Sequence, residues 1–160
     1  TFNFEFKGDL LYQIGRLKTP KYADRELHEF YQRVDSDAPN NFITGVWELN
    51  SGTYGENQND AQNIKERYGR VIKIITPNHW YAAFFNAEKA TLNGVGFGTY
   101  TLEGNQYTET IKAYSWDNSA VETTATFSMD RNGKQLHQYG KMNSDKYPDY
   151  VIDEQFVRIE

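Results

Sequence analysis

Cysteine is missing from this sequence altogether. Its absence excludes disulfide bonds, thiolate metal sites and cysteine nucleophiles, but it does not identify a compartment, since many exported bacterial proteins also lack cysteine. No apolar run approaches the roughly 20 residues that a membrane-spanning helix needs. The chain also begins at Thr1 with neither a Met nor an apolar leader, which indicates processing or truncation.

The sequence also has an excess of negative over positive charge, and few leucines. The formal net charge is -5 and no basic cluster offsets it, whereas a nucleic-acid-binding protein would normally carry a stripe of Lys and Arg to neutralise phosphates. Nucleic acid is therefore not expected as a partner. Aromatic residues make up 16% of the chain, and together with frequent β-branched residues they suit pleated strands better than helices. An all-β protein is predicted.

The sequence contains an internal repeat. Residues 1–35 align without a gap on residues 126–160, an offset of 125 positions. The residues of the first copy that meet an identical residue are Thr1, Phe2, Gly8, Leu11, Gln13, Gly15, Lys21, Tyr22, Asp24, Glu29 and Arg33, and most other pairs are conservative. We predict that residues 1–35 are the last three strands of a truncated copy of the domain that occupies residues 43–160. The polar segment 36–42 is predicted to be the linker.

The repeat resolves a conflict over residues 25–34. Leu27, Phe30, Tyr31 and Val34 fall at the spacing of an amphipathic helix. Their counterpart, residues 150–159, is rich in β-branched and aromatic residues and follows a Pro-Asp turn, which is typical of a strand. Because two copies of one unit should share one structure, we predict a strand over residues 25–34.

Short alternating runs separated by turn residues predict the rest of the fold. The predicted strands are 44–50, 70–76, 79–86, 95–102, 106–115, 121–129, 134–142 and 150–159. Four of the connections are short and carry Asn, Asp or Gly, as hairpins between neighbouring strands require. An eight-stranded up-and-down meander of this kind removes its exposed edges by closing into an antiparallel barrel. The one long connection, 51–69, is polar, with a helical turn or two expected within residues 60–67.

Gly45-Val46-Trp47 forms a G-x-W motif on the first predicted strand, and here the sequence resembles the lipocalin and calycin group. The longest loop follows this strand, and Arg158 lies on the last one. The segments 75–80 and 98–111 look more narrowly like a bacterial lipocalin-like family of unassigned function. The resemblance spans nearly all of residues 43–160 and leaves activity open.

The resemblance implies a structural role for three residues and an orientation for the barrel. In the lipocalin group the Trp of the motif, here Trp47 after Gly45, closes the barrel floor, and a basic residue near the end of the barrel, here Arg158, stacks over its ring in a cation-π contact. Such barrels are entered from the opposite end. The loop 51–69 is therefore expected to lie over the entrance and to touch any ligand.

Catalytic and metal chemistry find little support. Glu109 and Glu154, on the fifth and eighth predicted strands, could flank a substrate as acid and base, but Glu29 occupies the position of Glu154 in the other copy, and a scaffold role explains both. His28, His79 and His137 show no metal-ligand spacing. Gly94-Val-Gly-Phe-Gly98 lies inside strand-forming sequence, where glycine marks a bend or a close approach. No catalytic residue, metal or cofactor is predicted.

Aromatic residues concentrate on the third to fifth predicted strands, and a cup lined in this way suits a small apolar or aromatic ligand with a few polar anchors. The candidate ligand-binding residues are Trp80, Phe84, Phe97, Tyr100, Tyr107, Glu109, Gln138 and Glu154. The alternative is that these side chains fill the interior. An eight-stranded barrel is only just wide enough for one small ligand, so the sequence does not decide between the two.

These observations predict a non-enzymatic, lipocalin-like module that binds a small molecule and is exported to the envelope or periplasm of a bacterium. Two alternatives stay open: a filled-barrel interaction protein that works through its loops or through assembly, and a hydrolase using Glu109 and Glu154. Residues 1–35 would carry an exposed apolar face. That face must be covered by the barrel wall or by a partner chain, and the latter would give a homo-oligomer through the N-terminal strands.

Overall fold

The computed structural model describes residues 1–34, 38–55, 62–144 and 147–160. The chain divides into two compact units, Thr1–Ala38 and Pro39–Glu160. The first unit is an antiparallel sheet of three strands in the order β1 (Phe2–Lys7), β2 (Leu10–Leu17) and β3 (Arg25–Gln32). We predicted a strand over residues 25–34 although their apolar residues have helical spacing. This prediction is confirmed by β3, which pairs with β2 along its whole length.

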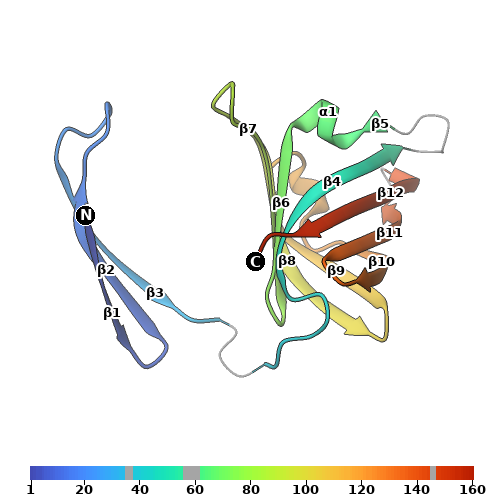
Figure 1. The fold of residues 1–160 in the computed structure, drawn as a ribbon, viewed down its shortest axis with the longest axis horizontal. Coiled ribbons are helices and arrows are strands. Elements are labelled where there is room, and N and C mark those ends of the chain that lie inside the picture. Colours follow the sequence, from blue (N-terminus) through green and yellow to red (C-terminus); the bar gives the residue numbers. More distant parts are fainter. Residues whose placement is uncertain (35–37, 56–61, 145–146) are drawn as a thin grey trace. The chain divides into compact units, whose positions relative to one another are not determined.

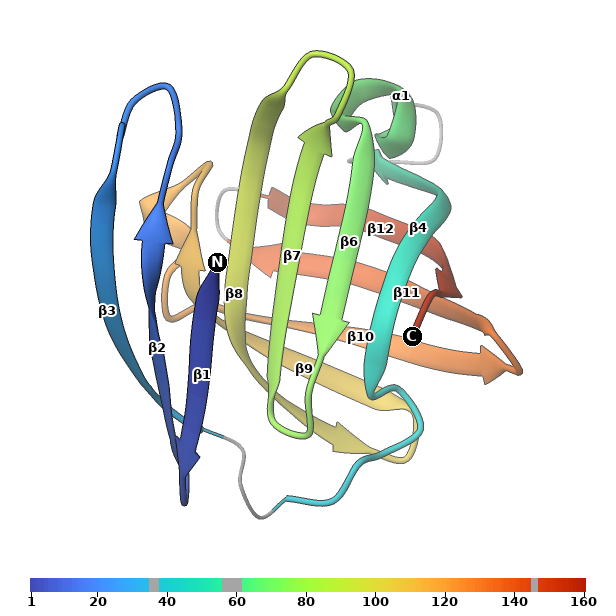
Figure 2. The same ribbon diagram turned by 60° about the vertical axis from the view of Figure 1, so that its left-hand side comes forward.

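The second unit is a closed barrel (Figures 1 and 2). Its elements are β4 (Gly45–Gly55), β5 (Gln62–Asn63), α1 (Ile64–Tyr68), β6 (Arg70–Ile75), β7 (His79–Asn86), β8 (Thr91–Glu103), β9 (Gln106–Tyr114), the 3-10 turn η1 (Asn118–Ala120), β10 (Thr124–Asn132), β11 (Gln135–Ser144) and β12 (Tyr147–Arg158). Strands β6 to β12 pair antiparallel in sequence order, β4 pairs with β6, and β12 returns to β4. The predicted all-β fold with eight barrel strands is confirmed.

The first barrel strand is longer than predicted. β4 continues to Gly55 because β12 pairs with it as far as Val151 opposite Gly55. The polar run after Asn50 hid this extension, since long-range pairing overrides local preference in a strand. The predicted helical turn is α1, a single turn that begins at Ile64 and is capped by the Asn63 side chain, which accepts hydrogen bonds from the backbone N–H groups of Lys65 and Glu66. The part of this prediction on residues 60 and 61 lies outside the described residues.

Alternation along each strand separates the inner face of the barrel from the outer face. The largest side chains buried in the interior include Trp47, Leu49, Ile75, Tyr107, Met129, Leu136 and Phe156. Strand β8 is unusual because glycines occupy its inner face at positions 94, 96 and 98. A Cβ atom at Gly94 would lie 2.0 Å from the Trp116 ring, and one at Gly96 would lie 3.0 Å from the Trp80 ring. The glycines therefore mark a close approach of these indoles to the strand, as predicted.

Candidate functional site

One end of the barrel is sealed around Trp47, which is completely buried. Its indole N–H donates a 2.8 Å hydrogen bond to the carbonyl of Ile43. The guanidinium of Arg158 lies over the ring at 5.7 Å from its centroid, so the predicted contact is confirmed, and Arg131 lies at 5.5 Å from the same ring. Gly45 has φ 153°, and a Cβ there would lie 3.3 Å from the Arg158 guanidinium. This explains the small residue of the motif.

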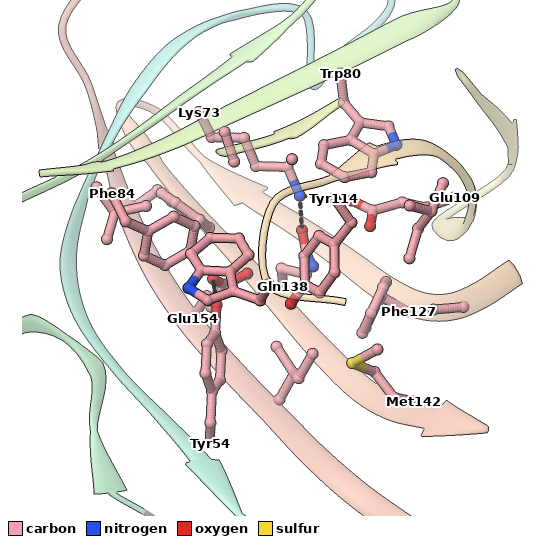
Figure 3. A pocket seen from close by; sticks show the side chains of 18 residues that line it. Tyr54, Lys73, Trp80, Phe84, Glu109, Tyr114, Phe127, Gln138, Met142 and Glu154 are labelled. Atoms are coloured by element: carbon pink, nitrogen blue, oxygen red, sulfur yellow. Dashed lines mark hydrogen bonds and ion pairs between the residues drawn. The ribbon is translucent and has the colours of Figure 1, made fainter. Parts of the chain in front are cut away.

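A buried ion pair lies inside the barrel (Figure 3). The Lys73 ammonium donates to a Glu109 carboxylate oxygen at 2.7 Å and to the Gln138 side-chain carbonyl at 2.6 Å. All three side chains are almost completely buried. The ammonium also lies 5.5 Å from the Trp80 ring centroid and 5.3 Å from that of Tyr107. A charge so placed is stabilised by its partner carboxylate and by the electron-rich ring faces.

A second carboxylate, Glu154, faces the same interior and is 4% exposed. The Tyr54 hydroxyl donates a 2.5 Å hydrogen bond to it (Figure 3). Burial raises the pKa of Glu154 above its ordinary value, while the Lys73 charge and the Tyr54 hydrogen bond act in the opposite direction. Burial also raises the pKa of Tyr54 and that of Tyr107 well above 10, and the nearby glutamates add to both shifts. Both hydroxyls therefore remain protonated donors at neutral pH.

A small cavity of about 70 Å³ is lined by the polar side chains of Tyr54, Lys73, Glu109, Gln138 and Glu154. Its other walls are apolar and include Trp80, Phe84, Tyr114, Phe127 and Met142. A second cavity of about 310 Å³ adjoins it, and the two share the side chains of Tyr54, Phe84, Tyr114, Trp116, Met142 and Ile152. Only the second has the volume of a ligand pocket, for which about 300 Å³ is a usual lower limit. The interior therefore offers a narrow inner chamber and a wider outer one.

The outer chamber lies at the end of the barrel opposite Trp47. Its lining comes from the last residues of β4, β9 and β11, from the first half of β12, and from the connection after β9 at Asp117 and Ala120. Phe84 of β7, Trp116, and Arg67 and Tyr68 of α1 also line it, so the connection after the first barrel strand reaches this end of the barrel as predicted. The residues of this connection between 56 and 61 lie outside the described part of the chain.

Of the eight candidate ligand-binding residues, five line the inner chamber: Trp80, Phe84, Glu109, Gln138 and Glu154. The other three do not line either chamber. Phe97 is 38% exposed and stacks on His79, with ring centroids 5.8 Å apart, because the inward positions of β8 are the glycines and Tyr100. Phe97 and Tyr100 have opposite parity on one strand, so they could not both face inward. Phe97 is therefore corrected to an outer-face residue.

Tyr100 and Tyr107 are corrected to core residues. Both are buried, and their ring centroids lie 4.9 Å apart. The Tyr100 hydroxyl donates to the carbonyl of Thr76 at 2.6 Å and accepts from the Asn41 side chain at 2.7 Å. These contacts connect Tyr100 to the segment before β4, so it has a structural role near the closed end.

Sequence reasoning missed Lys73, Tyr54 and Trp116. Lys73 lies in a run with apolar residues on both faces, so the direction of its side chain could not be read from the alternation. Tyr54 lay in a segment expected to be loop. Trp116 follows β9, and its ring packs against Phe84 and Tyr114 with centroids 4.9 and 4.8 Å away. The glycine at position 94 was the available signal for Trp116, since an inward glycine leaves room for a large neighbour.

The site has no recognisable metal-binding group. Across the described residues, no group of three or more His, Asp and Glu side chains could hold a metal ion. His137 lies on the outer face, 3.0 Å from the Asp153 carboxylate. Within the same ranges, no helix is long and apolar enough to cross a membrane.

The barrel has a lipocalin-like fold: eight sequential antiparallel strands, a Trp-sealed floor and an interior cavity open toward the other end. Among solved structures, one similar chain is a lipocalin-like protein from Bacteroides uniformis, at 14% identity and TM-score 0.48, covering 73% of this chain and 98% of that one. Another is an uncharacterized protein from Bacteroides eggerthii, at 13% identity and TM-score 0.45, covering 72% and 98%. No protein-family model and no curated protein matches the sequence.

Proposed function

We propose that the barrel binds a small molecule with an aromatic or apolar body and a head group that donates hydrogen bonds, with an organic ammonium as the best match. The observation that carries this proposal is Glu154, a carboxylate buried in the inner chamber and hydrogen-bonded to Tyr54. A buried carboxylate is costly unless it is compensated by charge or by hydrogen bonds.

The charges of the interior favour a cationic head group over an anionic one. Lys73 is matched by Glu109 in an ion pair of 2.7 Å. Glu154 is then the surplus acid of the inner chamber. A ligand ammonium beside it would restore neutrality, whereas a ligand carboxylate would add a second negative charge in a region of low dielectric constant.

The walls of the two chambers suit the same ligand. The rings of Phe84, Tyr114 and Trp116 line both chambers and that of Trp80 lines the inner one. Aromatic faces attract organic cations by about 0.5–2 kcal/mol each. A cavity of about 70 Å³ takes a head group of a few atoms, and the outer cavity of about 310 Å³ takes the apolar body.

Three matched probes test the proposal: 2-phenylethylamine, 2-phenylethanol and phenylacetate, each titrated against the protein by ligand-observed NMR. The amine should bind best and the acid worst. Glu154→Gln should remove the preference for the amine. Glu103→Gln, which changes an exposed carboxylate at the end of β8, is the matched control and should leave the preference unchanged. Equal binding of amine and acid would refute the proposal.

A filled-barrel interaction protein is the second candidate function, and the small volume of the inner chamber favours it. It predicts that none of the three probes binds and that native mass spectrometry of the protein from its source finds no co-purified small molecule. The hydrolase alternative has less support, because Lys73 and Tyr54 already engage the carboxylates that would act as acid and base. Export from a bacterial cell remains part of the proposal, and cell fractionation tests it.

A further inference from the structure

The three-stranded sheet of the first unit has the same register as three strands of the barrel. Phe2 lies opposite Gly15 in β1 and β2, and Phe127 lies opposite Gly140 in β10 and β11. Likewise Gln13 lies opposite Glu29, and Gln138 opposite Glu154. Each pair of the first unit becomes the corresponding barrel pair when 125 is added to both numbers. The sequence repeat is therefore also a repeat of strand pairing.

The repeat extends to a steric detail. A Cβ atom at Gly15 would lie 2.4 Å from the carbonyl oxygen of Thr1 and 2.6 Å from the Phe2 ring. At Gly140 the corresponding distances are both 2.7 Å, to Thr126 and to the Phe127 ring. In both sheets a phenylalanine ring lies across a glycine of the neighbouring strand, so the glycine leaves room for the ring in each.

The inward face of the barrel has a less buried counterpart in the first unit, where these positions are half-buried or exposed. Met129 is 0% exposed and Phe156 is 2% exposed, but their counterparts Phe4 and Tyr31 are 60% and 46% exposed. The residues of the first unit that correspond to inward barrel positions are Phe2, Phe4, Leu11, Gln13, Gly15, Leu17, Leu27, Glu29 and Tyr31. An apolar face of this kind is typical of a surface that is covered by another part of a protein.

The polar pair on this face also corresponds to the interior of the barrel. The Gln13 side-chain amide donates to Glu29 at 2.7 Å. In the barrel the corresponding amide, Gln138, instead has its carbonyl oxygen turned toward Lys73, which belongs to β6. The first unit thus has counterparts of Glu154 and Gln138 of the inner chamber. It lacks the strands that supply Tyr54 and Lys73 in the barrel.

We infer that the β1–β3 sheet is the closing wall of another barrel, and that its open face and edges take five strands of the types β4 and β6–β9 on the same polypeptide before Thr1. The edges specify the pairing. In the barrel β10 pairs with β9 and β12 pairs with β4, so β1 pairs with the last of the five strands and β3 with the first. A sheet of three strands with two free edges gains stability from such closure.

A chimera tests the inference: residues 42–125 of this chain are placed directly before Thr1 of the full chain. The repeat offset makes this the segment that completes the first barrel. Hydrogen exchange of the β1–β3 amides is compared with that in the unaltered chain and should slow by about 100-fold or more. A scrambled segment of the same composition is the control and should leave the exchange fast. Unchanged exchange in the chimera would overturn the inference.

Two further measurements keep the inference testable if the chimera does not fold. The gene upstream of Thr1 should encode a Gly-x-Trp about 80 residues earlier, by the repeat offset, and a frame without five strands of this type would overturn the inference. The association state of the unaltered chain is measured by sedimentation. A dimer whose β1–β3 amides are already protected would show that a second copy covers the sheet, which also overturns it.

Discussion

The guanidinium carbon of Arg158 lies 5.7 Å from the centroid of the Trp47 ring, and these residues pair across the strands that close the barrel. Arg131, which reaches the same ring from the end of β10, also donates to the carbonyl of Phe42 at 2.7 Å. The floor of the barrel is thus one aromatic ring held by two cations from different strands.

Trp47→Ala should lower the free energy of unfolding by about 3–5 kcal/mol, because it empties a large and fully buried site. Urea denaturation followed by circular dichroism measures the loss. Phe97→Ala, which truncates an aromatic side chain on the outer face, is the control and should cost clearly less. Equal costs for the two variants would contradict the assignment of Trp47 as the floor.

The Lys73–Glu109 pair predicts strongly non-additive mutations. Lys73→Met leaves the Glu109 carboxylate buried without its cation and should cost about 3–5 kcal/mol of stability. Adding Glu109→Gln to that variant removes the unpaired charge and should restore a large part of the loss. Denaturant titrations of the two single variants and the double variant measure the coupling. Additive costs would mean that the two side chains do not interact in solution.

Glu154 predicts a specific dependence of stability on pH. Because burial raises its pKa in the folded state above the ordinary 4.5, the folded protein holds this proton more tightly than the unfolded chain does. The resulting stabilisation is complete below the unfolded-state pKa and is lost as the pH rises through the folded-state value. Relative to Glu154→Gln, the natural protein should therefore lose stability as the pH rises from 4.5.

The control for this measurement is built into the comparison of the two proteins. Hydrogen bonds from Arg16 and Lys141 lower the pKa of Asp24 and that of Asp149, so these carboxyls act in the opposite direction at lower pH. They are common to both proteins and cancel in the difference. Denaturant titrations at several pH values measure the difference in free energy of unfolding between the two proteins. A difference that does not change with pH would contradict the burial of Glu154 as a titrating acid.

The inner glycines of β8 predict a graded response to alanine. A Cβ at Gly98 would lie 2.1 Å from the backbone carbonyl oxygen of Thr110, whereas one at Gly96 would lie 3.0 Å from the edge of the Trp80 ring. A side chain yields more easily than a paired strand, so Gly98→Ala should cost about 1–3 kcal/mol, the usual range for overpacking, and Gly96→Ala less. Melting temperatures give the order, and the reverse order would contradict the packing described.

The strand order could be predicted from the sequence because turn residues divide it into short alternating runs. The resemblance carried by the G-x-W motif correctly predicted the contact between Trp47 and Arg158. The repeat was needed for residues 25–34, where the local spacing alone predicted a helix. The extent of β4 could not be read, because pairing with β12 rather than local composition extends it to Gly55.

The site was harder to predict because two strands do not follow the usual rule that large apolar side chains face the interior. On β8 the glycines face inward and Phe97 faces outward, since the indoles of Trp80 and Trp116 already occupy the space above the strand. On β6 a lysine faces inward between Val71 and Ile75. Its partner Glu109 was a candidate, but nothing local to residue 73 indicates an ion pair with a strand so far along the chain.

The pairing of β12 with β4 has a consequence for synthesis. These strands lie at the two ends of the barrel sequence, so the ring cannot close until the last strand has left the ribosome. Contacts so distant in sequence make folding slow, and the unpaired edge of β4 stays open to wrong partners during that time. The β1–β3 hairpins form from local contacts alone and precede the barrel of the second unit in the chain. The β1–β3 sheet therefore forms while the barrel that follows it in the chain is still incomplete.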